Sequence, residues 1–302
     1  MSHPKLVAVD WGTTSLRIYA VDGKRNVLET LERAQGILAV TDQRFEVVLE
    51  EALALLVGHT EKVPIILSGM IGSRQGWFEA PYVKCPATIG DLAAQTVSVE
   101  NASGRTIKLV PGLETRSSTV CPDVIRGEET QIFGALAALK IEHGRFVLPG
   151  THSKWVTVSG SQIESFQTYM TGEVFSALKE HTILGRMMVE PGNDSAFERG
   201  VAASTEDGSP GRLLNQIFST RTLGLFGEVA DEEAASYLSG LLIGSEIRDG
   251  ARDHEGLLYI IAGSTLSDRY VRAARALGLE TLAIDPESIV QGHCSIAEAA
   301  GI

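Results

Sequence analysis

Cysteine is scarce in this sequence, with 3 residues among 302. Cys85, Cys121 and Cys294 are widely separated, form no CxxC pair and have no histidine at ligand spacing. We therefore expect neither a disulfide framework nor a structural zinc site. A chain of this length buries a sizeable core without such cross-links.

Basic residues are also few, because 26 Lys and Arg stand against 38 Asp and Glu and the formal net charge is -12. This balance argues against a nucleic-acid surface, which needs clustered Lys and Arg. No apolar run approaches the roughly 18 residues of a membrane span, and the first residues carry no signal-like segment. We expect a cytoplasmic protein with no membrane or nucleic-acid partner, in which any phosphate site is local.

The N-terminal residues predict an antiparallel meander. Apolar runs at 6–9 and 16–21 flank the turn Gly12-Thr13-Thr14-Ser15, and a third strand is expected near 27–31. An amphipathic helix over 45–57 and a buried strand over 63–67 follow. That strand ends in the glycine-rich loop 68–73, at the carboxyl edge of the sheet, where α/β folds bind ligands.

The same pattern returns in the second half of the chain. After a helix expected over 127–140, strands at 146–148 and 155–158 flank Gly150-Thr151-His152-Ser153. Both turns carry Gly-Thr-x-Ser, with Trp11 beside the first and Trp155 beside the second. The repeat predicts two α/β halves of similar fold, which we assign to domains 1–142 and 143–302. The last helix is a candidate to pack back on the first domain.

Three further segments complete the second half. Helices are expected over 174–188 and over 231–248, the latter with Asp231 as its N-cap. Gly240 and Gly244 lie one turn apart in it, which indicates either close approach of another helix or two tolerated glycines. A strand over 257–262 leads to Gly263-Ser264-Thr265, and Ser267 is expected to cap a helix to 278. A strand, a glycine loop and a helix N-terminus suit a nucleotide.

The two turns are the candidate phosphate sites. Asp10, at the end of the first strand, could hold Mg²⁺, while Gly12, Thr13 and Thr14 offer amides and hydroxyls. Arg17 could reach the transferred phosphoryl group. In the second turn the candidate contacts are Gly150, Thr151, His152, Ser153 and Lys154. Ordinary turn residues and solvated basic side chains are the alternative interpretation.

Phosphoryl transfer to an alcohol needs a carboxylate that accepts the hydroxyl proton. Glu128 and Glu129 stand at a predicted helix start before the second turn, and we prefer Glu128. Stabilisation of the helix dipole is the alternative role for both. Asp10 is a competing base, although a metal ligand is less free to take a proton.

An anionic sugar acid would need hydrogen-bond donors and a flat apolar surface. The segment 68–82 offers Arg74 for a carboxylate, Ser73 and Gln75 for hydroxyls, and Trp77 and Tyr82 for the carbon skeleton. Glu173 could add a polar contact. A loop that merely packs on its neighbour, and a helix cap at 171–173, are the alternatives.

Three motifs resemble those of the sugar kinase, Hsp70 and actin superfamily. VDWGTTSLR is similar to its first phosphate motif, LPGTHSKWVTV to its second and IIAGSTLSDRY to its adenosine motif. GWFEAPY, IRGEETQ, PGTHSKW, YMTGE and SGLLIG resemble the 2-dehydro-3-deoxygalactonokinase family along the whole chain.

The resemblance implies two ribonuclease H-like, actin-like ATPase domains around a nucleotide cleft, with adenosine at Gly263 and Ser264. It implies transfer of the γ-phosphoryl group of Mg-ATP to the 6-hydroxyl of 2-dehydro-3-deoxy-D-galactonate in galactonate catabolism. A homodimer is left open. The alternatives are a kinase of another small sugar or sugar acid, and a non-catalytic ATP-binding module of the superfamily.

Overall fold

The structure, a computed structural model, describes residues 3–56, 62–101, 104–116, 121–189, 192–204 and 212–302. The chain forms two compact units. Unit 1 comprises Met1–His143, Thr157–Phe166 and Pro286–Ile302, and unit 2 comprises Gly144–Val156 and Gln167–Asp285.

The first sheet belongs to unit 1 and has the strand order β3-β2-β1-β4-β7-β6. Its strands are β1 (Leu6–Trp11), β2 (Leu16–Val21), β3 (Val27–Arg33), β4 (Ile65–Ser68), β6 (Val97–Val99) and β7 (Ile107–Leu109). The predicted meander is confirmed, because β1 pairs antiparallel with β2 and β2 with β3. Strands β1, β4 and β7 run parallel to one another, so the loop after β4 lies at the same edge as the end of β1.

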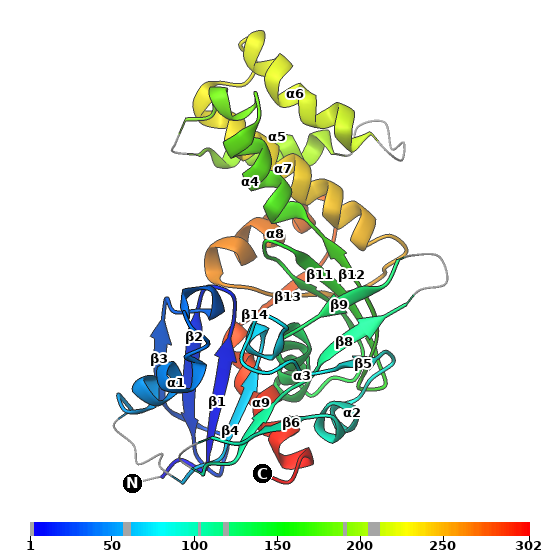
Figure 1. Ribbon diagram of the computed structural model, residues 1–302. Coiled ribbons are helices and arrows are strands. Elements are labelled where there is room, and N and C mark those ends of the chain that lie inside the picture. Colours follow the sequence, from blue (N-terminus) through cyan, green and yellow to red (C-terminus); the bar gives the residue numbers. More distant parts are fainter. Residues whose placement is uncertain (1–2, 57–61, 102–103, 117–120, 190–191, 205–211) are drawn as a thin grey trace. The chain divides into compact units, whose positions relative to one another are not determined.

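Strands β1 and β4 are apolar along most of their length because helices cover both faces of the sheet. On one face Phe45 and Leu49 of α1 (Phe45–Leu53) share a core with Trp11. On the other face α9 (Ile289–Ala299) packs on β1 and β4 and also on α3 (Glu128–Leu139). The C-terminal helix is therefore part of the core of unit 1 (Figure 1).

The second sheet repeats this arrangement, with the order β12-β11-β10-β13-β14. Its strands are β10 (Gly144–Leu148), β11 (Ser153–Ser159), β12 (Gln162–Tyr169), β13 (Leu258–Ile261) and β14 (Thr281–Ile284). Strands β10, β13 and β14 are parallel, as β1, β4 and β7 are. The prediction that the opening hairpin recurs in a second α/β half is confirmed.

A small three-stranded sheet was not predicted. It joins β5 (Tyr82–Lys84), β8 (Gly112–Thr115) and β9 (Asp123–Ile125), with α2 (Ile89–Ala94) following β5 in the chain. Strands of three or four residues are too short to show a period in the sequence. Its last strand, β9, is followed directly in the chain by α3.

The helices of unit 2 differ in detail from those expected. They are α4 (Thr171–His181), α5 (Asp194–Ala203), α6 (Leu213–Leu225), α7 (Asp231–Gly250) and α8 (Ser264–Ala276). Helix α4 ends seven residues earlier than predicted, because Thr182 is extended and its hydroxyl bonds to the Leu178 carbonyl. The N-cap of α7 is Ala230, and α8 begins after Gly263, so Ser267 lies inside the helix instead of capping it.

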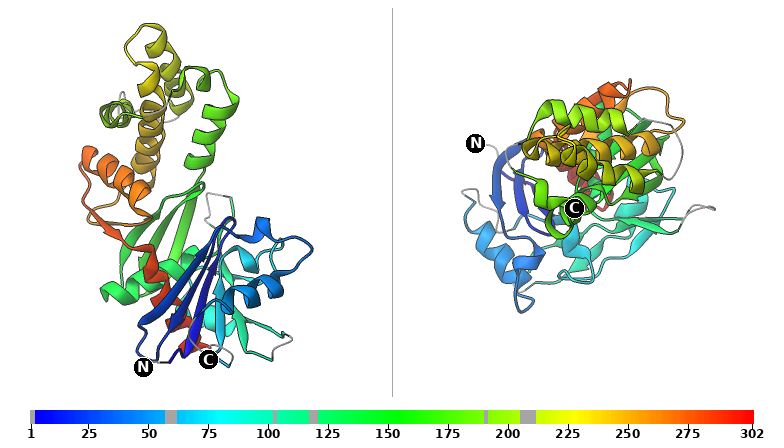
Figure 2. Two further views of the ribbon diagram at one scale, coloured as in Figure 1. Left: turned by 90° about the vertical axis from the view of Figure 1, so that its left-hand side faces the viewer. Right: turned by 90° about the horizontal axis from the view of Figure 1, so that it is seen from above.

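Of the two interpretations of the α7 glycines, close approach is correct. A Cβ on Gly240 would lie 2.0 Å from the Phe197 carbonyl oxygen of α5. Helices α5, α6 and α7 pack together in unit 2 (Figure 2). In the part of the chain that the structure describes, no helix is long and apolar enough to cross a membrane.

Candidate active site

Asp10 lies near the carboxyl end of β1, opposite Ser68 of β4. Its side chain is 15% exposed and lies 3.7 Å from Nη1 of Arg17, which also bonds to Glu32. Burial raises the pKa of Asp10 to about 6; the Arg17 charge opposes this rise and the Glu128 charge adds to it. The carboxylates of Asp10 and Glu128 are therefore close enough to influence each other.

Backbone contacts from the segment at Gly36 and Ile37 support the first turn. Gly12 N–H donates to the Ser15 carbonyl at 2.9 Å, and Thr13 and Thr14 are exposed at the tip. Ile37 N–H donates to the Gly12 carbonyl at 3.0 Å, from the short 3-10 helix η1 (Ile37–Ala39). A Cβ on Gly36 would lie 2.3 Å from the Thr13 backbone, so only glycine permits this contact.

Two glycines with positive φ bring the end of β4 against the start of α3. Gly69 has φ 90° and Gly127 has φ 107°, values that favour glycine. A Cβ on Gly69 would lie 3.3 Å from Asp10 Oδ1, and one on Gly127 would lie 3.1 Å from Gly69 Cα. This contact brings Asp10 near the first turn of α3, and we call Asp10, Glu128 and Glu129 the acidic cluster.

The two predicted base candidates lie in different surroundings. Glu128 is half-buried, and its Oε2 accepts a hydrogen bond from Arg126 N–H at 2.8 Å. Glu129 is fully buried and accepts from Gly127 N–H at 2.7 Å and from the Thr130 hydroxyl at 3.0 Å. Burial raises the pKa of Glu129 to about 7, and the Glu128 charge adds to this rise.

The predicted substrate residues of unit 1 lie in the segment from the β4 loop to β5. Ser73 is buried, and its hydroxyl has no partner among the described residues. Arg74 is 85% exposed and lies 3.5 Å from Glu79, and Gln75 is exposed. Trp77 packs partly on the core of unit 1, and the Tyr82 ring faces the Arg126 guanidinium at 4.3 Å.

The second turn is held by buried partners within unit 2. Ser153 Oγ accepts from Gly150 N–H at 3.5 Å and lies 2.9 Å from the Tyr270 hydroxyl. Lys154 is buried, with Nζ donating to Thr168 Oγ1 at 2.8 Å. His152 at the tip pairs with Glu173 of α4, so these two predicted site residues lie together.

Sequence reasoning missed Glu246, a buried carboxylate of α7 beneath this turn. It accepts from Trp155 Nε1 at 2.8 Å and from the Tyr270 hydroxyl at 2.7 Å. Burial raises its pKa, while these hydrogen bonds oppose the rise. A single glutamate between the apolar residues Ile243 and Ile247 of α7 was the signal that could have found it.

Unit 2 also has a small hollow beside the second turn. Its volume is about 80 Å³, and its lining includes Gly150, Gly172, Phe175, Arg269 and Tyr270, from the turn, α4 and α8. The predicted adenosine residues lie at the start of α8, where Gly263 is the N-cap and Ser264 the first helical residue.

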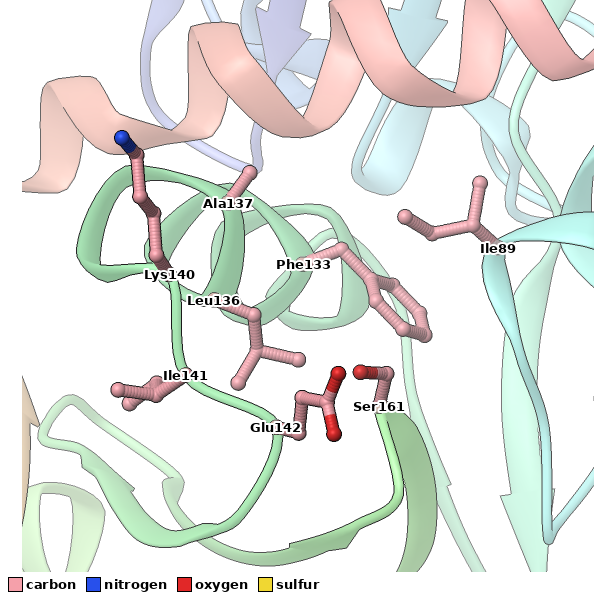
Figure 3. A pocket seen from close by; sticks show the side chains of 8 residues that line it. All are labelled: Ile89, Phe133, Leu136, Ala137, Lys140, Ile141, Glu142 and Ser161. Atoms are coloured by element: carbon pink, nitrogen blue, oxygen red, sulfur yellow. The ribbon is translucent and has the colours of Figure 1, made fainter.

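A larger hollow of about 320 Å³ lies at the other end of α3 from the acidic cluster. Phe133, Leu136 and Ile89 form an apolar wall, while the Glu142 and Ser161 side chains point toward each other (Figure 3). None of the predicted site residues lines it. Among the described residues there is also no cluster of three or more His, Cys, Asp or Glu suited to a metal.

A comparison with family profiles matches residues 10–296 to the 2-keto-3-deoxy-galactonokinase family. This chain belongs to that family. A curated relative, the 2-dehydro-3-deoxygalactonokinase of Escherichia coli, is 34% identical over 98% of both chains. A candidate enzyme of the same name from Rhizobium meliloti is 36% identical over 97% of this chain and 96% of its own.

A solved structure agrees with these relatives. The crystal structure of a candidate 2-dehydro-3-deoxygalactonokinase from Sinorhizobium meliloti superposes with a TM-score of 0.89, at 34% identity. The match covers 97% of this chain and 98% of the other. The kinase function expected from the sequence is thereby confirmed at the level of the family.

Proposed function

We propose that this chain transfers the γ-phosphoryl group of ATP to the 6-hydroxyl of 2-dehydro-3-deoxy-D-galactonate, in galactonate catabolism. The observation that carries the proposal is the family match over residues 10–296, which includes both turns and the acidic cluster. A catabolic kinase of this kind works in the cytoplasm. Assembly as a homodimer stays a prediction.

Glu128 is the proposed base. It is half-buried next to Asp10, and described residues bond only one of its oxygens, whereas the Glu129 carboxylate is fully buried and bonded at both oxygens. Glu128 would accept the proton of the substrate hydroxyl as the new P–O bond forms. Arg17, beside Asp10, would donate to the transferred phosphoryl oxygens.

Asp10 fits a magnesium ion held through phosphate. Mg²⁺ usually keeps several waters and takes one or two carboxylates plus phosphate oxygens, so a single partly exposed carboxylate suffices. The bound ion would neutralise charge on the phosphates. Gly12, Thr13 and Thr14 would contribute amides and hydroxyls to the same phosphates.

In unit 2 we assign Gly150, Thr151, His152, Ser153 and Lys154 to phosphate contacts and Gly263 and Ser264 to adenosine. The hollow beside Gly150 supports this assignment. The matching strand order of the two sheets supports two ribonuclease H-like, actin-like ATPase domains. Their boundary at 142/143, and the sharing of one nucleotide by both turns, stay predictions.

The sugar acid is assigned to Ser73, Arg74, Gln75, Trp77 and Tyr82, with Glu173 as a further polar contact. The buried Ser73 hydroxyl, which no described residue pairs with, supports the hydroxyl-binding role. Trp77 and Tyr82 offer the apolar surface for the carbon chain.

Steady-state ADP release with and without 2-dehydro-3-deoxy-D-galactonate tests the proposal. We expect ADP release to depend on the acid, with acetate and glycerol inactive as controls. A panel of other 2-keto-3-deoxy acids separates this kinase from one for a related sugar acid. Slow ATP hydrolysis that no sugar acid changes would instead indicate a non-catalytic ATP-binding module.

A further inference from the structure

Arg126 is a buried arginine without an acidic partner among the residues that the structure describes. It follows β9 and precedes the Gly127 N-cap of α3, and it is 9% exposed. Its Nη2 donates to the Ala80 carbonyl at 2.9 Å, and its guanidinium lies over the Tyr82 ring at 4.3 Å. Nε and Nη1 are buried and have no hydrogen-bond partner among the described residues.

A buried guanidinium is costly unless an anion compensates its charge. Arg105 shows the usual solution, because its side chain is also largely buried but lies 3.4 Å from the Glu50 carboxylate. No such pair to Arg126 is formed within the described ranges. The carbonyl of Ala80 and the Tyr82 ring hold the guanidinium in place, but no described carboxylate pairs with it, and two of its nitrogens have no described partner.

The Nη1 atom of Arg126 lies against the loop assigned to the substrate. A Cβ on Gly72 would lie 3.1 Å from it, and Gly72 directly precedes Ser73, whose buried hydroxyl also has no partner among the described residues. A polar group before α3 and one in the loop after β4, neither with a partner among the described residues, therefore lie on either side of Gly72. The backbone of Arg126 also bonds to Glu128, so the arginine and the proposed base belong to one turn.

We propose that Arg126 binds the carboxylate of the sugar acid, with Ser73 donating to an adjacent oxygen. This inference rests on the proposed function and names a residue that the sequence pattern did not single out. A guanidinium suits a carboxylate because its planar donors match two carboxylate oxygens. Binding the acid at one end leaves the hydroxyl at the other end for Glu128.

The test compares the acid with its neutral 1-carboxamide in wild type and in Arg126→Met. We expect wild type to prefer the acid by about 100-fold in kcat/KM, and the variant to favour neither by more than about 3-fold. The KM for the acid should rise about 100-fold while the KM for ATP stays near wild type, because the contact is made in the ground state. Arg126→Lys, which keeps the charge but loses the planar fork, should raise the KM for the acid by about 10-fold.

Variants of two other arginines serve as a control and as a test of a rival residue. Arg44→Met, at an exposed position before α1, is the matched control and should behave as wild type. Arg74→Met tests the rival arginine of the same loop. A preference for the acid that collapses in Arg74→Met and survives in Arg126→Met would overturn the proposal.

Other outcomes would also overturn the proposed role of Arg126. Equal losses with acid and amide in the Arg126 variants, or failure of both variants to fold, would mark Arg126 as a structural support. A wild type that does not discriminate acid from amide would likewise overturn the inference. If wild type phosphorylates no 2-keto-3-deoxy acid, the proposed function fails as well; if it does and Arg126→Met keeps the preference, only this inference fails.

Discussion

Glu128 and Glu129 are adjacent in the sequence, yet they differ in what they can reach. Glu128 is half-buried near Asp10, and within the described part of the chain only one of its oxygens accepts a hydrogen bond, whereas Glu129 is fully buried and bonded at both. We predict that Glu128→Gln lowers kcat by about 10² or more and leaves ATP binding near wild type, because an amide cannot accept the proton. Single-turnover phosphorylation and equilibrium titration with ATP measure the two quantities.

Glu232→Gln is the matched control for this prediction. Glu232 is an exposed glutamate in the first turn of α7, so its loss changes a helix dipole interaction without touching the acidic cluster. The control should keep wild-type turnover. Near-normal turnover in Glu128→Gln would remove Glu128 as the base.

Glu129 predicts a pH-dependent stability. Its pKa is about 7 in the fold against an ordinary 4.5, so between these values the folded state binds more protons than the unfolded state. The stabilisation from Glu129 is therefore complete below about pH 4.5 and is lost as the pH rises through about 7. The effect amounts to about 3 kcal/mol.

Glu129→Gln does not titrate and should lack this loss. Urea unfolding of wild type and Glu129→Gln from pH 4.5 to 7.5, without metal or nucleotide, measures the difference. Asp10, whose pKa is also raised, contributes in the same direction in both proteins and cancels. Parallel pH curves for the two proteins would contradict a buried, proton-binding Glu129.

At the scale of residues, the sequence indicated the three carboxylates of the acidic cluster but not the different burial of Glu128 and Glu129. Asp10 and the two glutamates were visible because each follows a strand or begins a helix beside glycine. Their different burial depends on Gly69 and Gly127, which join segments far apart in the chain. Arg126, the proposed carboxylate contact, and Glu246, buried beneath the second turn, were missed because nothing local shows which polar side chains the fold will bury.

At the scale of elements, both hairpins were predictable, but the segments that support them were not. Gly36 supports the first turn and Gly172 the second, each at a distance that excludes a Cβ. A hairpin can be recognised from the residues of its own turn, whereas a supporting contact depends on a segment that is distant in the sequence. The three-stranded sheet was missed for a different reason, because its strands of three or four residues are too short to show a period.

Gly172→Ala tests the support of the second turn. The new Cβ would lie 2.5 Å from the Gly150 carbonyl oxygen and 2.8 Å from Thr151 Cα, so the turn must move. We expect a loss of about 1–3 kcal/mol in the free energy of unfolding and a rise of about 10-fold in the KM for ATP. Gly23→Ala, whose nearest neighbour would be Lys5 Cγ at 3.6 Å, is the matched control. An unchanged KM for ATP would show that the second turn does not bind the nucleotide.

At the scale of the whole molecule, the repeat of the hairpin correctly indicated two similar α/β halves. The sequence could not show how the chain is shared between them, because that depends on tertiary packing. Unit 1 includes Pro286–Ile302, more than a hundred residues after its main segment ends at His143. The last helix of the chain therefore packs on the N-terminal sheet and is part of the core of unit 1.

This sharing predicts the effect of removing residues 286–302. Helix α9 buries Ile289, Val290 and Ile296 in unit 1, and each such side chain contributes about 1.5–3 kcal/mol. Their loss is comparable to the whole stability of a typical domain, about 5–15 kcal/mol. A chain ending at Asp285 should lose hydrogen-exchange protection in β1, β2 and β4 and keep it in β10, β13 and α7, with no sugar-acid-dependent ADP release. A chain ending at Ala300 retains all of α9 and should match wild type, and full protection of β1 in the shorter chain would contradict this role of the helix.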